Sequence, residues 1–212
     1  ELAGAAGFAE IINEGPGIKA RIAAARIVLE KSDHAERVLR LMGEFGADTD
    51  RYADHHPWTA RLTRDADIGQ TRSRHDMRLA VFNYPIEGWT DAVVMNLLMG
   101  RAGVIQLQEL AQVSYQPLAE VFRAILPVET RHAELAEEGL AQLVDSYGVE
   151  GLQEQVDYWW PRVAASLGQD PSDKFEGLKA LGLRRTPNSA LKTRWQETAA
   201  AILQKAGLRP GR

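Results

Sequence analysis

Glu129 and His132 form a Glu-x-x-His motif inside a long apolar-periodic stretch of the chain. A spacing of three residues places both side chains on one face of an α-helix. A carboxylate beside an imidazole suits iron or manganese, and helical bundles build two-metal sites from such pairs. The same spacing is frequent on solvated helix faces, and the acidic neighbours Glu134, Glu137 and Glu138 favour that alternative.

Histidine and acidic residues also occur on two earlier stretches. His34 has a carboxylate four residues before it, Glu30, but the position three residues before it is Lys31, where a second Glu-x-x-His motif would need an acid. Glu10 is the acid of the first apolar stretch that could point inward. Each residue is unremarkable alone, because a single histidine on an amphipathic helix is usually structural.

A polar stretch holds three more histidines. Asp54, His55 and His56 adjoin one another, and His75 lies further along. These residue types could bind a metal, but a solvated loop is the favoured interpretation, because the stretch has no sustained apolar periodicity. We interpret residues 47–72 as a short helix followed by a loop. No glycine-rich motif follows a predicted strand, which excludes a dinucleotide-binding fold.

Amphipathic stretches that must position these residues dominate the chain. Apolar residues such as Ile22 and Leu29 recur at helical spacing. Gly15-Pro16-Gly17 breaks the pattern, and Gly46 and Gly148 are expected to end helices. We expect helices over residues 2–13, 19–45, 89–113, 117–146, 149–167, 172–181 and 189–206. Because short breaks join long helices as antiparallel neighbours, the sequence predicts one all-α domain.

The composition excludes several functional classes. The 212 residues carry a net charge of -4, which argues against a non-specific nucleic-acid binder. The absence of cysteine excludes disulfides, thiol catalysis and zinc–thiolate sites. No apolar run reaches the roughly 18 residues of a membrane span. We therefore expect a cytoplasmic protein without nucleic-acid or membrane partners, and the first residue, Glu1, leaves a preceding leader open.

Five landmarks follow one another in a recognisable order. They are Phe82-Asn83-Tyr84-Pro85, Trp89-Thr90-Asp91, Ser114-Tyr115-Gln116-Pro117, Glu129-Thr130-Arg131-His132 and Tyr158-Trp159-Trp160-Pro161. Their order and spacing resemble the phenylacetic acid catabolic protein family, in particular the catalytic subunits of its phenylacetyl-CoA epoxidases, over roughly residues 8–208. The resemblance implies a ferritin-like four-helix bundle over about residues 1–147, with a C-terminal helical extension over about residues 149–206.

The resemblance also implies an activity. Family members of this kind are di-iron enzymes that activate O2 and epoxidise an aromatic ring held as a CoA thioester, with electrons from a reductase and beside a related metal-free helical subunit. The implied partners are an aromatic acyl-CoA and either a second copy, in a homodimer, or a related helical subunit. Arg184, Arg185, Lys192 and Arg194 could contact a CoA phosphate, although a solvated basic face is the favoured interpretation.

The six metal ligands that the resemblance implies carry over only in part. Four positions match, which are Glu10 on the first helix, His34 on the second, and Glu129 with His132 on the fourth. The second-helix glutamate falls on Lys31, so an ammonium would stand where a carboxylate is expected. A positive charge there opposes metal binding in surroundings of low dielectric constant. The same ammonium could replace a metal by neutralising Glu10 and Glu129.

The acid expected on the third helix falls on Gly100. Asp91 does not replace it, because nine residues at about 100° each put Asp91 half a turn away from that face. The sequence therefore favours a degenerate site that holds no metal, or iron as a single ion.

Three functions remain open at this point. The first is a non-catalytic or altered subunit of the family that binds acyl-CoA. The second is an active, iron-dependent aromatic acyl-CoA mono-oxygenase with unusual ligands. The third is a plain helical interaction module.

Overall fold

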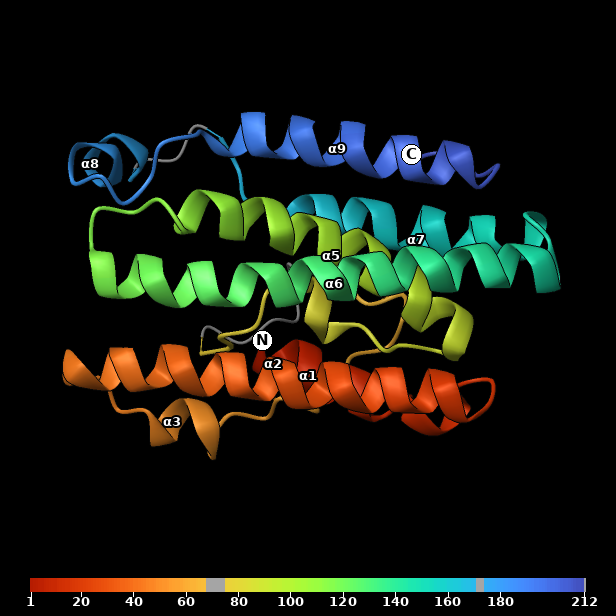
Figure 1. The fold of residues 1–212 in the computed structure, drawn as a ribbon, viewed down its shortest axis with the longest axis horizontal. Helices are drawn as coiled ribbons and strands as arrows, with labels where there is room; N and C mark the ends of the chain where they lie inside the picture. The colour runs from red at the N-terminus through yellow and green to blue at the C-terminus, as the bar shows by residue number, and fades with distance from the viewer. Residues whose placement is uncertain (68–74, 171–173, 212) are drawn as a thin grey trace. The chain divides into compact units, whose positions relative to one another are not determined.

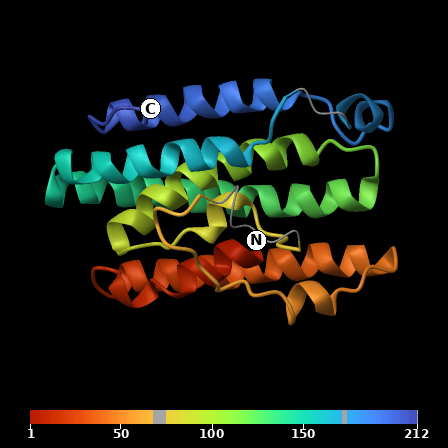
Figure 2. The ribbon, with the colours of Figure 1, turned by 180° about the vertical axis from the view of Figure 1, so that it is seen from behind.

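The computed structural model describes residues 1–67, 75–170 and 174–211, and these residues contain eight α-helices and no strand (Figures 1 and 2). The prediction of an all-α fold is confirmed, and the helices are consistent with a ferritin-like bundle. The chain forms two compact units, Glu1–Ala92 and Val93–Arg212, and each is described by itself. The assignment of the whole chain to a single domain stays a prediction.

The first unit is built on a helical hairpin. Its elements are α1 (Leu2–Ala9), the 3₁₀ turn η1 (Ile12–Glu14), α2 (Ile18–Glu44), α3 (Asp50–Ala53) and the 3₁₀ turn η2 (Ala80–Asn83). α1 lies alongside α2 (Figure 1). The first helix ends earlier than predicted, because the chain tightens into a 3₁₀ turn, as helix ends often do. Gly17, with a φ of 87°, then starts α2.

The two sides of α2 are both apolar in its first half. Ala24 and Ile27 are buried, whereas Ile22 and Leu29 are 52% and 70% exposed. Two residues along a helix correspond to a rotation of about 200°, so the exposed pair lies opposite the buried pair. The helical spacing of Ile22 and Leu29 therefore predicted the helix correctly, although these two residues lie on its exposed side.

The second unit contains four long helices that run along one another (Figures 1 and 2). Its elements are α5 (Trp89–Leu110, which begins in the first unit), α6 (Gln116–Tyr147), α7 (Glu150–Ser166), α8 (Phe175–Ala180) and α9 (Asn188–Lys205). Trp195 of α9 is fully buried and its Nε1 donates a 2.9 Å hydrogen bond to the carbonyl of Leu98 on α5. Its ring also packs against Trp160 of α7, with 4.6 Å between ring centroids. The aromatic stretch of α7 thus belongs to this core.

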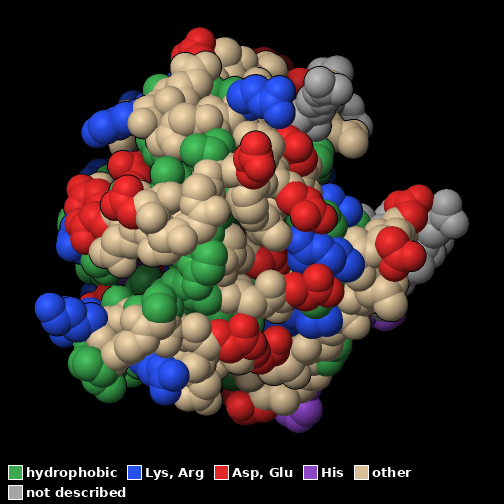
Figure 3. All heavy atoms as spheres, turned by 90° about the vertical axis from the view of Figure 1, so that its right-hand side faces the viewer, with side chains coloured by type: hydrophobic (Ala, Val, Ile, Leu, Met, Phe, Trp, Pro, Cys, Tyr) green, Lys and Arg blue, Asp and Glu red, His purple; other side chains and the backbone are tan. Residues whose placement is uncertain are grey.

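The predicted helix boundaries hold within a few residues. Gly46 and Gly148 follow α2 and α6 with φ values of 76° and 74°, as expected for residues that end helices. The start of the helix predicted over residues 172–181 lies outside the described residues. No described helix has the length and apolar character needed to cross a bilayer. Acidic and basic side chains are interspersed on the face drawn in Figure 3.

Candidate functional site

The Glu-x-x-His motif lies on the buried side of α6. Glu129 and His132 are 3% and 6% exposed. Nδ1 of His132 lies 3.2 Å from Oε1 of Glu129, so a protonated Nδ1 donates a hydrogen bond to the carboxylate. The solvated-face alternative is wrong for this pair. It holds for Glu134 and Glu138, which are exposed and form ion pairs with Arg131.

Gly100 of α5 lies directly against α6 beside this pair. A Cβ atom added at Gly100 would lie 3.3 Å from Cβ and 3.4 Å from Cα of Ala133, the neighbour of His132. Contacts this short require the neighbour to shift, and the neighbour here includes the backbone of a fully buried residue. The third-helix position thus offers no ligand and little room for a larger side chain.

In the first unit, Lys31 and His34 lie one helical turn apart on α2. Nζ of Lys31 forms a 3.2 Å ion pair with Oε2 of Glu1, and both side chains are partly buried. A carboxylate oxygen of Glu1 lies within 4.8 Å of a ring nitrogen of His34, which is 3% exposed. The ammonium that the sequence places on this turn is therefore paired with an acid from the start of α1.

Glu10 lies at the other end of α1. Its side chain is 46% exposed and its Oε1 lies 3.5 Å from Nη2 of Arg61. Glu1 and Glu10 are nine residues apart, so they face opposite sides of the helix. The structure brings Glu1 to Lys31 and His34, and Glu10 to Arg61. The metal-binding role of Glu10 stays a prediction, while Glu1 is a candidate that the sequence pattern did not identify, because it precedes the first helical residue.

Asp91, in the first turn of α5, is fully buried. Its two carboxylate oxygens accept hydrogen bonds of 3.0 and 2.9 Å from the Arg64 guanidinium, and one also accepts a 2.9 Å bond from the Glu87 amide. These contacts give the carboxylate a structural role at the start of α5. They agree with its exclusion as a metal ligand on helical geometry.

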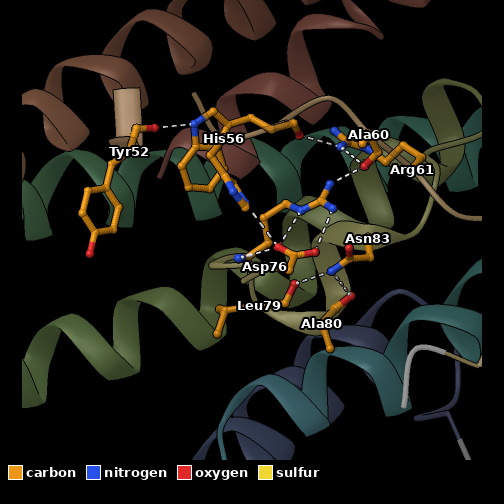
Figure 4. A network of polar contacts seen from close by, with 10 residues as sticks. Tyr52, His56, Ala60, Arg61, Asp76, Leu79, Ala80 and Asn83 are labelled. Carbon is orange, nitrogen blue, oxygen red and sulfur yellow. Dashed lines mark hydrogen bonds and ion pairs between the residues drawn. The ribbon is translucent and has the colours of Figure 1, made fainter. Parts of the chain in front are cut away.

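Two histidines of the polar stretch, His55 and His56, have different hydrogen-bond partners. His55 donates from Nδ1 to the Asp50 carbonyl at 3.2 Å, while His56 directs Nε2 toward Oδ1 of Asp76, also at 3.2 Å (Figure 4). His56 and Asp76 are nearly buried. His56 therefore belongs to a polar network inside the first unit, and the expectation of a wholly solvated loop is wrong for this residue.

Three arginines of the C-terminal region contact neutral amides of α5 and of the turn that follows it. Arg184, Arg185 and Arg194 donate to the side-chain oxygens of Gln106, Gln112 and Gln108, at 3.2, 3.2 and 3.0 Å respectively. Burial alone would raise the pKa of the neighbouring Glu109 carboxyl. The hydrogen bonds that this carboxylate accepts from the Thr186 and Arg185 amides outweigh burial, so its pKa is lowered. These contacts attach the turn before α9 to α5.

Apart from the contact between His56 and Asp76, each unit places a carboxylate close to an imidazole on a long helix. In the first unit this is Glu1 with His34, and an ammonium is bound to the same acid. In the second unit it is Glu129 with His132, hydrogen-bonded to each other. Such pairs can hold a proton or a cation, and the total charge around each pair decides which.

The chain is similar to a known protein family over nearly its whole length. The profile of the family described as "Phenylacetic acid catabolic protein" matches residues 1–211. The chain is also 23% identical over 134 residues to the A-type subunit of 1,2-phenylacetyl-CoA epoxidase from Escherichia coli (strain K12). That match covers 61% of this chain and 43% of the relative, so the aligned part spans less than half of the relative's length. By the match over residues 1–211, the chain belongs to the phenylacetic acid catabolic protein family.

Proposed function

We propose that this chain is an altered, non-catalytic member of its family, in which a lysine ammonium takes the place of metal charge. The observation that carries the proposal is the ion pair between Lys31 and Glu1, 3.2 Å long and partly buried. Lys31 stands three residues before His34, where the resemblance implies a glutamate ligand. An ammonium at that distance gives the carboxylate the positive charge that a metal would otherwise supply.

The residues present do not fit a di-iron centre. Two ferrous ions call for about four carboxylates, and two of the implied positions are Lys31 and Gly100. A unit charge about 4 Å from an ammonium costs roughly 4 kcal/mol at an effective dielectric constant of 20, and a divalent cation costs twice that. At Gly100, the close approach of Ala133 opposes any replacement side chain. One position thus repels a metal and the other cannot bind it.

Metal content tests the proposal directly. Protein purified from iron-supplemented cells is expected to contain no stoichiometric iron by plasma mass spectrometry. Two irons per chain, together with a ligand-to-metal absorption band, would overturn it. The double variant Lys31→Glu/Gly100→Asp asks whether the two positions suffice to restore binding, and Lys31→Met controls for removal of the ammonium alone.

An aromatic acyl-CoA and a second helical protein of the family are the ligands that we propose for this chain. Family membership and the name of the epoxidase relative support this assignment. Calorimetry with phenylacetyl-CoA, with free CoA as the control, tests the ligand, and sedimentation velocity tests self-association. Absence of both interactions would favour the third function, a plain helical interaction module with another partner.

A second candidate function is an iron-dependent oxygenase that uses fewer ligands. It is favoured by the buried carboxylate and imidazole of Glu129 and His132, 3.2 Å apart. Turnover of phenylacetyl-CoA with a reductase and O2, lost in His132→Ala while the circular dichroism spectrum is unchanged, would establish it. No turnover in iron-loaded protein would exclude it.

A further inference from the structure

The first unit contains a pocket whose lining includes none of Glu1, Glu10, Lys31 and His34. Its volume is about 430 Å³, within the range of small-molecule sites. Arg51, His55 and His75 contribute polar groups to its lining, and Leu62 and Met77 contribute apolar surface. We propose that this pocket binds a small organic carboxylate with a compact apolar body.

The pocket rests on a polar network whose charges cancel. Asp76 accepts hydrogen bonds from Nε and Nη2 of Arg78 at 3.0 and 2.9 Å, from the Arg78 amide at 2.9 Å, and from His56 at 3.2 Å (Figure 4). Arg78 also donates from Nη1 to the carbonyl of Ala60. Asp76 and Arg78 are each less than a tenth exposed. The lining therefore contains an electrically neutral, hydrogen-bonded salt bridge that does not need a ligand.

Arg51 is left as an uncompensated charge at this pocket. The residue is exposed, its backbone amide donates to Asp48, and its guanidinium forms no ion pair within the part of the chain that the structure describes. Among the described residues that line the pocket, Asp76 is the one carboxylate, and Arg78 already neutralises it. The described part of the lining is thus positive by one charge, which favours an anion.

The chemistry of the lining narrows the class of anion. A guanidinium matches a carboxylate with two parallel hydrogen bonds. One unpaired guanidinium balances a monoanion, whereas a phosphate dianion would call for more fixed positive charge. Leu62 and Met77 offer apolar surface that a hydrated inorganic ion would not use. An organic acid with an apolar body satisfies both parts of the pocket.

Three test compounds separate the contribution of the carboxylate charge from that of the apolar body. Phenylacetate joins one carboxylate to a compact apolar body, phenylacetamide keeps the shape without the charge, and acetate keeps the charge without the body. By titration calorimetry at neutral pH, phenylacetate is expected to bind at least about tenfold more tightly than either, because loss of a charged hydrogen bond or of the buried ring costs about 1.4 kcal/mol or more. Absence of phenylacetate binding, or equal binding of acid and amide, overturns the proposal.

A matched pair of variants locates the site. Arg51→Gln is expected to weaken phenylacetate binding about tenfold, because it removes the unpaired guanidinium while leaving the fold intact at an exposed position. Arg26→Gln removes an equally exposed guanidinium from α2, away from the lining, and is expected to leave the affinity unchanged. Equal effects of the two variants would assign the binding to general surface charge and overturn the proposal. None of these measurements depends on metal content, so the outcome is separate from that of the proposed function.

Discussion

Lys31 and Gly100 both stand where the family resemblance implies a carboxylate ligand. The two residues differ in how they would prevent metal binding. Lys31 replaces the carboxylate with the opposite charge, and the flexible side chain reaches Glu1 to form an ion pair. Gly100 has no side chain that could serve as a ligand, and Ala133 of α6 occupies the adjacent space. We therefore expect charge to oppose a metal at the first position and packing to oppose a ligand at the second.

The difference matters because the two kinds of change respond to different perturbations. A charge effect at a partly exposed position is modest and is screened by salt. A packing effect between two helices is insensitive to salt and is larger, because close-packed interiors relax only partly. Stability measurements can therefore separate the two positions without any metal being present.

The largest effect is expected for Gly100→Asp. The added side chain would meet Ala133 and bring a carboxylate into a packed interface, so we expect a loss of about 2–3 kcal/mol in the free energy of unfolding. Gly103→Asp is the control on the same helix, because a Cβ atom at Gly103 meets no atom within 4 Å. The control is expected to change stability by about 0.5 kcal/mol or less in urea denaturation. Equal losses in both variants would mean that packing does not close this position.

The ion pair of Asp76 with Arg78 shows how much a fully hydrogen-bonded charge pair adds to the free energy of unfolding, for comparison with Lys31 and Glu1. Burial would raise the pKa of this carboxyl, but the hydrogen bonds and charge of Arg78 and the bond from His56 lower it from 3.8 to about 2. The folded state thus favours the ionised form, and the stabilisation is complete above pH 3.8 and is lost as the pH falls through 2. At about 1.4 kcal/mol per pKa unit, it amounts to about 2 kcal/mol.

Urea denaturation between about pH 2 and pH 7 measures this contribution. Asp76→Asn is expected to lose most of it at neutral pH and to show a flatter decline of stability in acid than the unmodified protein. A variant whose stability declines with pH as steeply as that of the unmodified protein would assign the acid sensitivity to other carboxylates.

The smallest effect is expected at Lys31. Lys31→Met removes the ion pair with Glu1 but keeps an apolar stem, so we expect a loss of about 0.5–1 kcal/mol. Lys31→Glu places two like charges together and is expected to lose somewhat more. Both losses should shrink in about 1 M NaCl, where the screening length is about 3 Å, whereas the loss in Gly100→Asp should not. A salt-insensitive loss at Lys31 would make packing the common cause at both positions.

Much of the helical architecture was predictable from local signals. The apolar periodicity and the breaks at Gly46 and Gly148 predicted α2 and α6 within a few residues. α6 and α7 continue through Pro127 and Pro161, as the long apolar patterns indicated. What periodicity alone did not predict was which side of α2 is buried, because its first half is apolar on both sides.

The candidate site was predictable where it depends on neighbours along one helix. Glu129 and His132 are three residues apart, and their contact follows from helical geometry. The pairing of Lys31 with Glu1 and the approach of Ala133 to Gly100 join residues that are far apart in the sequence, and they depend on how helices pack. Helix register brings Glu1 rather than Glu10 near His34, whereas the apolar pattern and the resemblance had both selected Glu10.

The contact between Gly100 and Ala133 has an evolutionary consequence. Replacing glycine by an acid, aspartate or glutamate depending on the codon, takes a single base change, so at the genetic level an acid at this position is easily reached. At the structural level, the first carbon of that side chain would meet Cβ and Cα of Ala133 at 3.3 and 3.4 Å. A returning acid would therefore need α5 and α6 to move apart by a few tenths of an ångström, at a cost in stability before it has any benefit. The close contact thus makes a reversal at this position more costly in stability than the single base change suggests.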